Sequence, residues 1–407
     1  MKKNLVAFAV AAAVLVPGAA FAADSSAKDN GPILYGYAQI TGSQQFGTGP
    51  SASNGLVFGA NRIRLGVKGE AVHGVTYNIM AGWDNAAISG NNGGLGNLLN
   101  NGLGNGGNAS IVDAWLNYAP VPFAQLEVGK FKQPVGNEYV DVQGNALPFI
   151  FRSMGQSLLP GRSAGAMLHG NDVMGTGFGY ALAISDASSF DYGSAYNNLE
   201  AGSHPSGGGQ GYFLNGSGQY IFSGRLTYDF MGPLLHAELS GAQMTLPLSN
   251  MYNADSLTTW NVGVHGGLMG IHYVAGYTNL NTGRSRNGQA GVSAQDWNVG
   301  LGVNLHQMTL TPSWLDIEPA VRFDSFSYND HRGTDEKLDN TTVGLNYYVN
   351  PNNPHAAQIQ VNYIIPTGRS GKFGPYATAS TGVFGGYGAP INGMAYNTLM
   401  LQFQAGF

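Results

Sequence analysis

The chain has 407 residues, of which 43% are hydrophobic, 10% are charged and 62 are glycine, and it contains no cysteine. This composition excludes a disulfide framework and a Cys-ligated metal or haem. Low charge with 11% aromatic residues argues against disorder, and the formal net charge of −5 disfavours a nucleic-acid partner, which requires a clustered basic excess. A large all-β body fits best.

Residues 1–22 are predicted to be a secretory signal peptide. Two lysines precede an apolar run, Leu5 to Val16, and an A-x-A cleavage site follows at residues 20–22. The run is shorter than the ~20 residues that a helix needs to span a bilayer, which disfavours an N-terminal anchor. Cleavage would leave residues 23–407 as a single domain with 16 of the 18 Lys+Arg and all 23 Asp+Glu, a formal charge of −7. A preference for anions must therefore come from the positions of the basic residues.

From Pro32 onward the sequence consists of short alternating stretches, and a generous count gives sixteen strands. In residues 62–70, RIRLGVKGE, the charged side chains share one parity and the apolar side chains the other, which is the period of a strand with two unlike faces. Residues 113–118, 297–306 and 357–363 alternate similarly. A soluble sandwich would need partner sheets for its apolar faces, whereas a closed transmembrane antiparallel β-barrel, apolar outward and polar inward, removes every edge.

The predicted connections alternate in length. Short ones are expected at residues 73–74, 120–122, 171–175, 231–232, 268–270, 306–307 and 351–354. Long ones are expected at residues 41–54, 85–109, 133–161, 186–217, 246–257, 281–292, 329–336 and 366–393. Short periplasmic turns and longer outside loops are typical of outer-membrane barrels.

The carboxyl-terminal residues 397–407 also alternate. Leu399, Leu401 and Phe403 share one face, and the chain ends on Phe407. This segment is similar to the terminal strand of bacterial outer-membrane barrels, whose last Phe is typically recognised by the assembly machinery. It supports localisation in the bacterial outer membrane.

Four segments resemble a known family: RIRLGVKGE (62–70), VDAWLNYAP (112–120), LEVGKFKQPVGNE (126–138) and PGRSAGAMLHG (160–170). In this order they resemble the phosphate-selective porin O/porin P family. The resemblance implies a homotrimer of sixteen-stranded barrels in outer-membrane lipid and lipopolysaccharide, whose third outside loop folds into the lumen and whose basic residues guide small inorganic or organic anions. No cofactor is implied.

The implied constriction loop spans residues 133–161. Three prolines stiffen it, and its apolar cluster is expected to pack against the inner wall: Phe149, Ile150, Phe151, Leu158 and Leu159. The alternative is an outside loop that folds over the barrel mouth or into the trimer contact. Selective family members gather lysines from two loops, but the fifth outside loop here, residues 246–257, has no Lys or Arg. A nonspecific anion pore therefore remains an alternative to a phosphate site.

Strand parity predicts which basic residues face the lumen. A cation on the lipid-facing parity would cost ~2 to 4 kcal/mol at the bilayer midplane, and a row of cations along a channel wall lowers the barrier for anions. Three further bases, Lys132, Arg152 and Arg162, lie in or beside the constriction loop. Together with the strand residues they make up the predicted anion-guiding set, which is Arg62, Arg64, Lys68, Lys132, Arg152, Arg162, Arg225 and Arg322.

Two alternatives apply to these bases. Strict alternation sends Lys130 and Lys132 outward toward lipid head groups, unless Gly129 marks a β-bulge that shifts the parity. The other bases could pair with neighbouring acids and only hold the inner wall together; these acids are Glu70, Glu238, Glu318 and Asp324.

Histidines and short motifs add little chemistry. His265 and His272 flank a predicted turn on the inward parity and are expected to pair face to face, but two His are too few for a closed zinc site, so no metal is predicted. The sequence has no G-x-S-x-G and no H-E-x-x-H, and no enzyme is predicted, although a non-local triad would leave no such motif. Residues 90–108 are Gly/Asn-rich and lack the aspartates of a calcium-binding repeat, so an outer loop is predicted.

The sequence thus predicts a passive outer-membrane porin for small hydrophilic solutes, with a preference for anions and phosphate as a candidate solute. A general porin with weak or cation preference is the first alternative, favoured by the negative mature charge. The second is a closed barrel that acts as a surface adhesin or structural protein through its long loops at residues 85–109 and 186–217.

Overall fold

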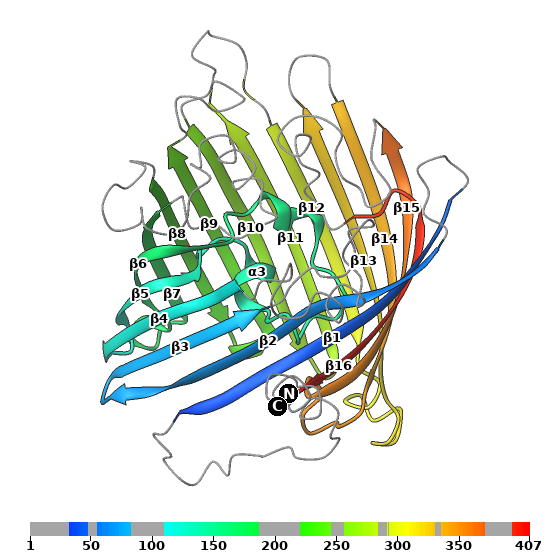
Figure 1. Ribbon diagram of the computed structural model, residues 1–407, viewed down its shortest axis with the longest axis horizontal. Helices are drawn as coiled ribbons and strands as arrows, with labels where there is room; N and C mark the ends of the chain where they lie inside the picture. Colours follow the sequence, from blue (N-terminus) through cyan, green and yellow to red (C-terminus); the bar gives the residue numbers. More distant parts are fainter. Residues whose placement is uncertain are drawn as a thin grey trace, which may run out of the picture.

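The computed structural model is a closed barrel of antiparallel strands (Figure 1). It describes residues 32–47, 55–82, 110–186, 220–245, 256–283, 291, 293–329, 335–370 and 393–407. In these parts of the chain sixteen strands pair in sequence order, and the last strand pairs with the first to close the ring. The prediction of an all-β, sixteen-stranded transmembrane barrel is confirmed. The predicted signal peptide, residues 1–22, lies outside the described residues.

The strands are β1 (Ile33–Phe46), β2 (Leu56–Val72), β3 (Val75–Gly82), β4 (Ser110–Val121), β5 (Ala124–Lys132), β6 (Arg162–Gly170), β7 (Phe178–Asp186), β8 (Tyr220–Phe230), β9 (Leu235–Thr245), β10 (Ser256–Leu268), β11 (Ile271–Thr282), β12 (Ser293–Val303), β13 (Asp316–Asn329), β14 (Asp335–Tyr348), β15 (Ala357–Ser370) and β16 (Asn397–Gly406). One short α-helix, α3 (Asn137–Asp141), and three 3-10 turns, η2 (Met154–Leu158), η3 (Val173–Gly175) and η6 (Gly232–Leu234), complete the described elements. None of the helices in these ranges is long and apolar enough to cross a membrane.

The two faces of the barrel wall differ as the alternation predicts. Outward side chains such as Leu65, Val299 and Phe403 are apolar and exposed. Inward side chains such as Asn298 and Gln360 are polar and buried. This arrangement puts apolar side chains where lipid tails lie and keeps the hydrogen-bonding side chains inside the ring.

The alternation is interrupted at local irregularities. The register between β1 and β2 shifts after the pair Gln39 and Arg62, so Asn61 is an extra residue in β2. A bulge of this kind lets consecutive side chains face the same side of a sheet. Asn61 is accordingly buried and bonded inside the barrel, next to Arg62.

Most predicted connections agree with the strand ends to within two residues, and three differ by more. The connections predicted at 41–54 and 366–393 begin later, because β1 continues to Phe46 and β15 to Ser370. The two-residue turn predicted at 306–307 is wrong: β12 ends at Val303 and residues 304–315 form a longer connection. The side chain of Asn304 ends the strand there, since it donates to Asp316 Oδ1 at 2.8 Å and accepts from the Gln307 N–H. The predicted loop at 85–109, and that at 186–217 apart from Asp186, which ends β7, lie outside the described residues.

The channel lumen and its constriction loop

The segment between β5 and β6 folds into the barrel. It spans residues 133–161, as predicted, and a backbone hydrogen bond from Gln133 N to Gly161 O (2.9 Å) closes its base. In Figure 1 this segment, with α3, crosses the interior of the ring of strands, and α3 and η2 contact the inner wall at β10 to β13. The alternative, a loop folded over the mouth or into a trimer contact, does not describe these residues.

Amide side chains of the wall hold the irregular backbone of the loop. Inside a barrel an extended loop carries carbonyl and N–H groups that must find partners. Asn and Gln on the inward parity of β1, β2 and β14 to β16 supply them. These bonds are Gln39 to Gly144 O, Gln404 and Gln358 to Asn145 O, Gln360 to Leu147 O, Asn346 to Pro148 O, Asn61 to Ile150 O, and Ile150 N to Asn362 Oδ1.

Apolar contacts hold the other half of the loop. Met154, Leu158 and Leu159 are buried against apolar residues on the inner face of β8 to β14, such as Met244 and Phe326. A second cluster joins Ile150 and partly buried Phe151 to Ile364, Met394 and Met400. Phe149 is buried under the guanidinium of Arg322, 4.8 Å from its ring centroid. The predicted packing of this apolar cluster on the inner wall is thus present.

Three of the predicted bases gather around the ring of Tyr139 in α3. Lys132 Nζ lies 5.2 Å from the ring centroid and donates to the Tyr139 carbonyl at 2.7 Å. The guanidinium of Arg152 lies 5.5 Å from the centroid and that of Arg162 6.0 Å. Sequence reasoning did not single out Tyr139, because nothing in its local pattern distinguishes it from other loop residues.

The two lysines of β5 diverge. The pairing register runs without a shift from Leu126 through Lys132, so the bulge at Gly129 that was the alternative to strict alternation is absent, although this glycine has a φ of +132°. Lys130 donates to the Ile111 carbonyl at an exposed position. Lys132 turns inward to the loop, against the outward direction that strict alternation gives, because the Tyr139 carbonyl and ring receive its ammonium.

Arg152 carries its charge within the loop. It is buried, and it donates to the backbone carbonyls of Glu138 (3.3 Å) and Val142 (2.5 Å). Burial, and next the neighbouring Arg62, lower the pKa of Arg152 to about 10. At neutral pH the guanidinium is therefore still positively charged.

Arg62, Arg64 and Lys68 follow β2 down the lumen side of the wall. Arg62 donates to Gln39 Oε1 at 2.9 Å, and Arg64 is buried beside Gly82 of β3. Lys68 is exposed, with its ammonium 5.2 Å from the ring centroid of Tyr35. Glu70, a predicted partner for these bases, instead accepts from the Gly74 N–H at 2.7 Å in the turn that follows β2.

Arg162 and the two remaining bases, Arg225 and Arg322, form ion pairs. Arg162 pairs with Asp113 (2.7 Å), a partner that the sequence did not suggest. Arg322 pairs with Asp324 (2.7 Å), and Arg225 with Glu238 (2.6 Å) and Asp141 (2.5 Å). The interpretation that some bases hold the wall together thus describes the contacts of these three. Arg322 also donates to Phe151 O and Arg152 O, which fastens the loop to β13.

The predicted histidine pair is wrong in its partners. His265 pairs in register with Val274 and, across the other edge of β10, with His236; His272 pairs with Gly267 instead. A pairing of His265 with His272 requires a turn centred on Leu268 and Met269; the observed turn is centred on Met269 and Gly270, which moves every partner by two residues. The inward parity of His236 follows from Glu238 two residues on, but its place beside His265 depends on strand register.

Between the loop and the wall lies a cavity of about 230 Å³. Its lining includes Phe149 from the loop and His265, His272, Glu318, Tyr348 and His355 from the wall and its turns. The lining is mainly apolar.

Solved structures share this architecture. The chain is similar to an anion-selective porin from Comamonas acidovorans (12% identity, TM-score 0.60, covering 93% of this chain and 99% of that one) and to OmpF of Salmonella typhi, solved as a complex with daunomycin (12%, 0.59, 93% and 98%). It is also similar to the outer-membrane channel DcaP of Acinetobacter baumannii (11%, 0.54, 92% and 97%). At these identities the likeness defines the fold, which is that of a porin. No curated protein matches the chain.

A porin barrel with a loop fastened in its lumen defines an outer-membrane channel rather than an enzyme. The sequence matches the family of phosphate-selective porins O and P over residues 41–240 and 273–372, well over half of the chain. The protein belongs to this family.

Proposed function

We propose that the protein is a passive diffusion channel that prefers small anions, inorganic phosphate among them. It would act in the outer membrane as a homotrimer, after removal of residues 1–22 from the single barrel domain of residues 23–407. Solutes would pass through water beside the constriction loop, without covalent chemistry, cofactor or energy input. All eight predicted bases would contribute, those on β2 and the loop most directly.

The observation that carries this proposal is the hydrogen bonding of Arg152. Its guanidinium, which is charged at neutral pH, donates to main-chain carbonyls, which are neutral. An ion pair cancels most of a base's field at a distance, whereas a carbonyl partner leaves the positive charge of Arg152 in place. In the narrowed part of the lumen the guanidinium of Arg152 lies 5.5 Å from the ring centroid of Tyr139, near the side chains of Lys132 (5.2 Å) and Arg162 (6.0 Å). Guanidinium and ammonium groups at one place suit phosphate and carboxylate oxygens.

The first test is the sign of the reversal potential. The refolded full chain is inserted in a planar bilayer with a KCl gradient, and a potential on the anion side is expected. Phosphate is then added at low concentration; block of the chloride current would show a phosphate site, and its absence would favour a nonspecific anion pore. A cation-side potential would contradict the anion preference, and a barrel that folds without conductance would favour the adhesin alternative.

Replacing Arg152 by Gln keeps donors for the two carbonyls and removes the charge. A unit charge about 8 Å from a passing ion in water is worth about 0.5 kcal/mol, favourable for an anion and unfavourable for a cation, so the anion-to-cation permeability ratio should fall about 5-fold. Lys337→Gln is the matched control, since Lys337 lies exposed on β14 beside Asp339 and far from Tyr139 in the chain. Equal ratios in the two variants would rule out a role for Arg152.

A further inference from the structure

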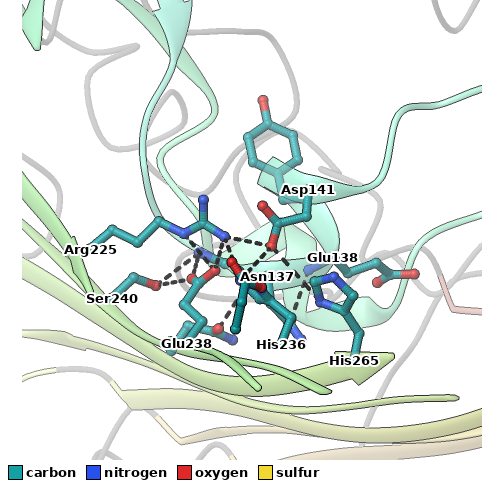
Figure 2. Close-up of polar contacts among 12 residues, drawn as sticks. Asn137, Glu138, Asp141, Arg225, His236, Glu238, Ser240 and His265 are labelled. Atoms are coloured by element: carbon teal, nitrogen blue, oxygen red, sulfur yellow. Dashed lines mark hydrogen bonds and ion pairs between the residues drawn. The ribbon is translucent and has the colours of Figure 1, made fainter. Parts of the chain in front are cut away.

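Two histidines and one carboxylate meet where the constriction loop touches the wall. Asp141 ends α3, His236 lies on β9 and His265 on β10 (Figure 2). Their ligand atoms lie within 4.8 Å of one another. Asp141 is exposed and the two imidazoles are half-buried, so a hydrated ion in the lumen can reach all three.

The distances are close to those of a metal site. Asp141 Oδ2 lies 3.4 Å from His236 Nε2 and 3.9 Å from His265 Nδ1. In a tetrahedral site with metal–ligand bonds of about 2.0 Å, ligand atoms are about 3.3 Å apart. Movements on the order of 1 Å, within the reach of side-chain rotation, would therefore complete the coordination. Three protein ligands fill three of the four tetrahedral positions and leave the fourth for water, as in open zinc sites.

The outer contacts of the imidazoles also suit a metal. His236 Nδ1 lies 2.6 Å from Asp229 Oδ1. A carboxylate at Nδ1 keeps the proton there and leaves Nε2, the nitrogen that faces Asp141, as an acceptor; metal-binding histidines usually have such a partner. His265 Nδ1 is buried and makes no hydrogen bond within the described residues, although it points toward Asp141.

An internal cation lies at this carboxylate in the structure. Arg225 donates to Asp141 Oδ2 at 2.5 Å and lies 3.4 Å from His236 Nε2. The same guanidinium is held by Glu238, whose other oxygen accepts from Ser240 and from the Gly136 N–H (Figure 2). If Arg225 moved back toward Glu238, Asp141 would be released to a metal without leaving either arginine or glutamate unpaired.

We propose that Asp141, His236 and His265 form a lumen site for a divalent transition-metal ion of the Zn²⁺ type, which binds by exchange with Arg225. Imidazole and carboxylate ligands suit such ions. The bound ion would link α3 to β9 and β10, fix the constriction loop against the wall and change the charge that solutes meet there. The consequence is a channel whose conductance depends on metal.

Zinc titration of the refolded full chain, freed of metal and kept in detergent, tests the site by calorimetry. We expect one Zn²⁺ per chain. His236→Ala, His265→Ala and Asp141→Asn should each raise the Kd by at least about 10-fold, and Asp229→Asn by about 10- to 100-fold. His73→Ala, at an exposed turn histidine, is the matched control and should not change it.

Arg225→Gln provides the decisive result, because the exchange predicts that this variant binds Zn²⁺ more tightly, and a gain in affinity cannot come from misfolding. A folded barrel without saturable binding, or an unchanged Kd in both histidine variants, would overturn the proposal. So would weaker binding by Arg225→Gln. The binding assay needs no ion current, so its failure is separate from a failure of the anion preference. In bilayers, Zn²⁺ should lower the conductance of the native channel and not that of His236→Ala.

Discussion

His355 is a half-buried base that lines the cavity behind the loop. It lies in the connection between β14 and β15, with its ring edge-on to Tyr348 at a centroid distance of 6.2 Å. Burial, and next the nearby His272, lower the pKa of His355 below its ordinary value of 6.5. Glu318, which lines the same cavity, accepts from the Tyr348 hydroxyl at 3.0 Å. His355 is therefore neutral at pH 7, and protonation would put a half-buried positive charge there.

This residue should make the barrel sensitive to acid. Because the folded-state pKa of His355 is below its unfolded value, the unfolded chain binds more protons in acid than the folded barrel does. The contribution of neutral His355 to the free energy of unfolding is therefore complete above pH 6.5. It is lost as the pH falls through the lower folded-state pKa. The urea midpoint of the native barrel should fall between pH 7.5 and pH 5, and that of His355→Gln should fall less. His73→Gln serves as control, since that side chain is exposed. Parallel curves for native and His355→Gln barrels would contradict the assignment.

At the scale of single residues, strand parity predicted which way a basic side chain points better than it predicted which residue that side chain pairs with. The cost of a cation in lipid is large enough to place Arg62 and Arg322 inside from sequence alone. Whether a base meets an acid depends on strand register, which a turn shifted by one residue changes, as His265 shows. Lys132 points inward because of a carbonyl seven residues later in the loop, a contact without any periodic signal.

At the scale of elements, the constriction loop and the wall are complementary in chemistry. The apolar run of the loop could be recognised in the sequence because such a run is unusual in a loop surrounded by water. The amides of the wall could not, since Gln and Asn on the inward parity are also what an ordinary pore lining contains. Only the structure shows that Gln360 and its neighbours bind the loop backbone rather than water.

Gln360 is the central test of this attachment. It donates to Leu147 O at 2.8 Å and to Asn346, and it accepts from Gln402. Gln360→Leu leaves these buried groups without partners, at a cost of about 1–3 kcal/mol. Hydrogen exchange of loop peptides around residues 144–150 should become faster while the strands stay protected. Gln243→Leu, on the exposed outer face of β9, should leave the exchange unchanged. Unchanged loop exchange in Gln360→Leu would show that the loop is held elsewhere.

At the scale of the whole molecule, the membrane decides which side of the sheet is outside. Large apolar side chains stand exposed around the outer face, Leu182 and Leu226 among the most exposed at 60% each. In water such a surface would aggregate, whereas in lipid it costs nothing. This is why the fold could be predicted as a whole from alternation, while the interior, where loop and wall meet, could not.

A substitution of Leu182 tests directly whether the outer face of the barrel lies in lipid. Leu182 lies in the middle of β7, between Leu168 of β6 and Gly224 of β8, on the outward parity. Leu182→Arg should destabilise the barrel folded in liposomes by about 2–4 kcal/mol, because the charge must enter the hydrocarbon zone. Leu310→Arg, at an exposed residue of the 304–315 connection, should cost close to nothing. Urea titrations followed by tryptophan fluorescence give both values. Because Leu182 and Leu310 are similarly exposed in the isolated barrel, at 60% and 67%, a difference between the two variants reports depth in the bilayer, and equal costs would mean that β7 does not face lipid.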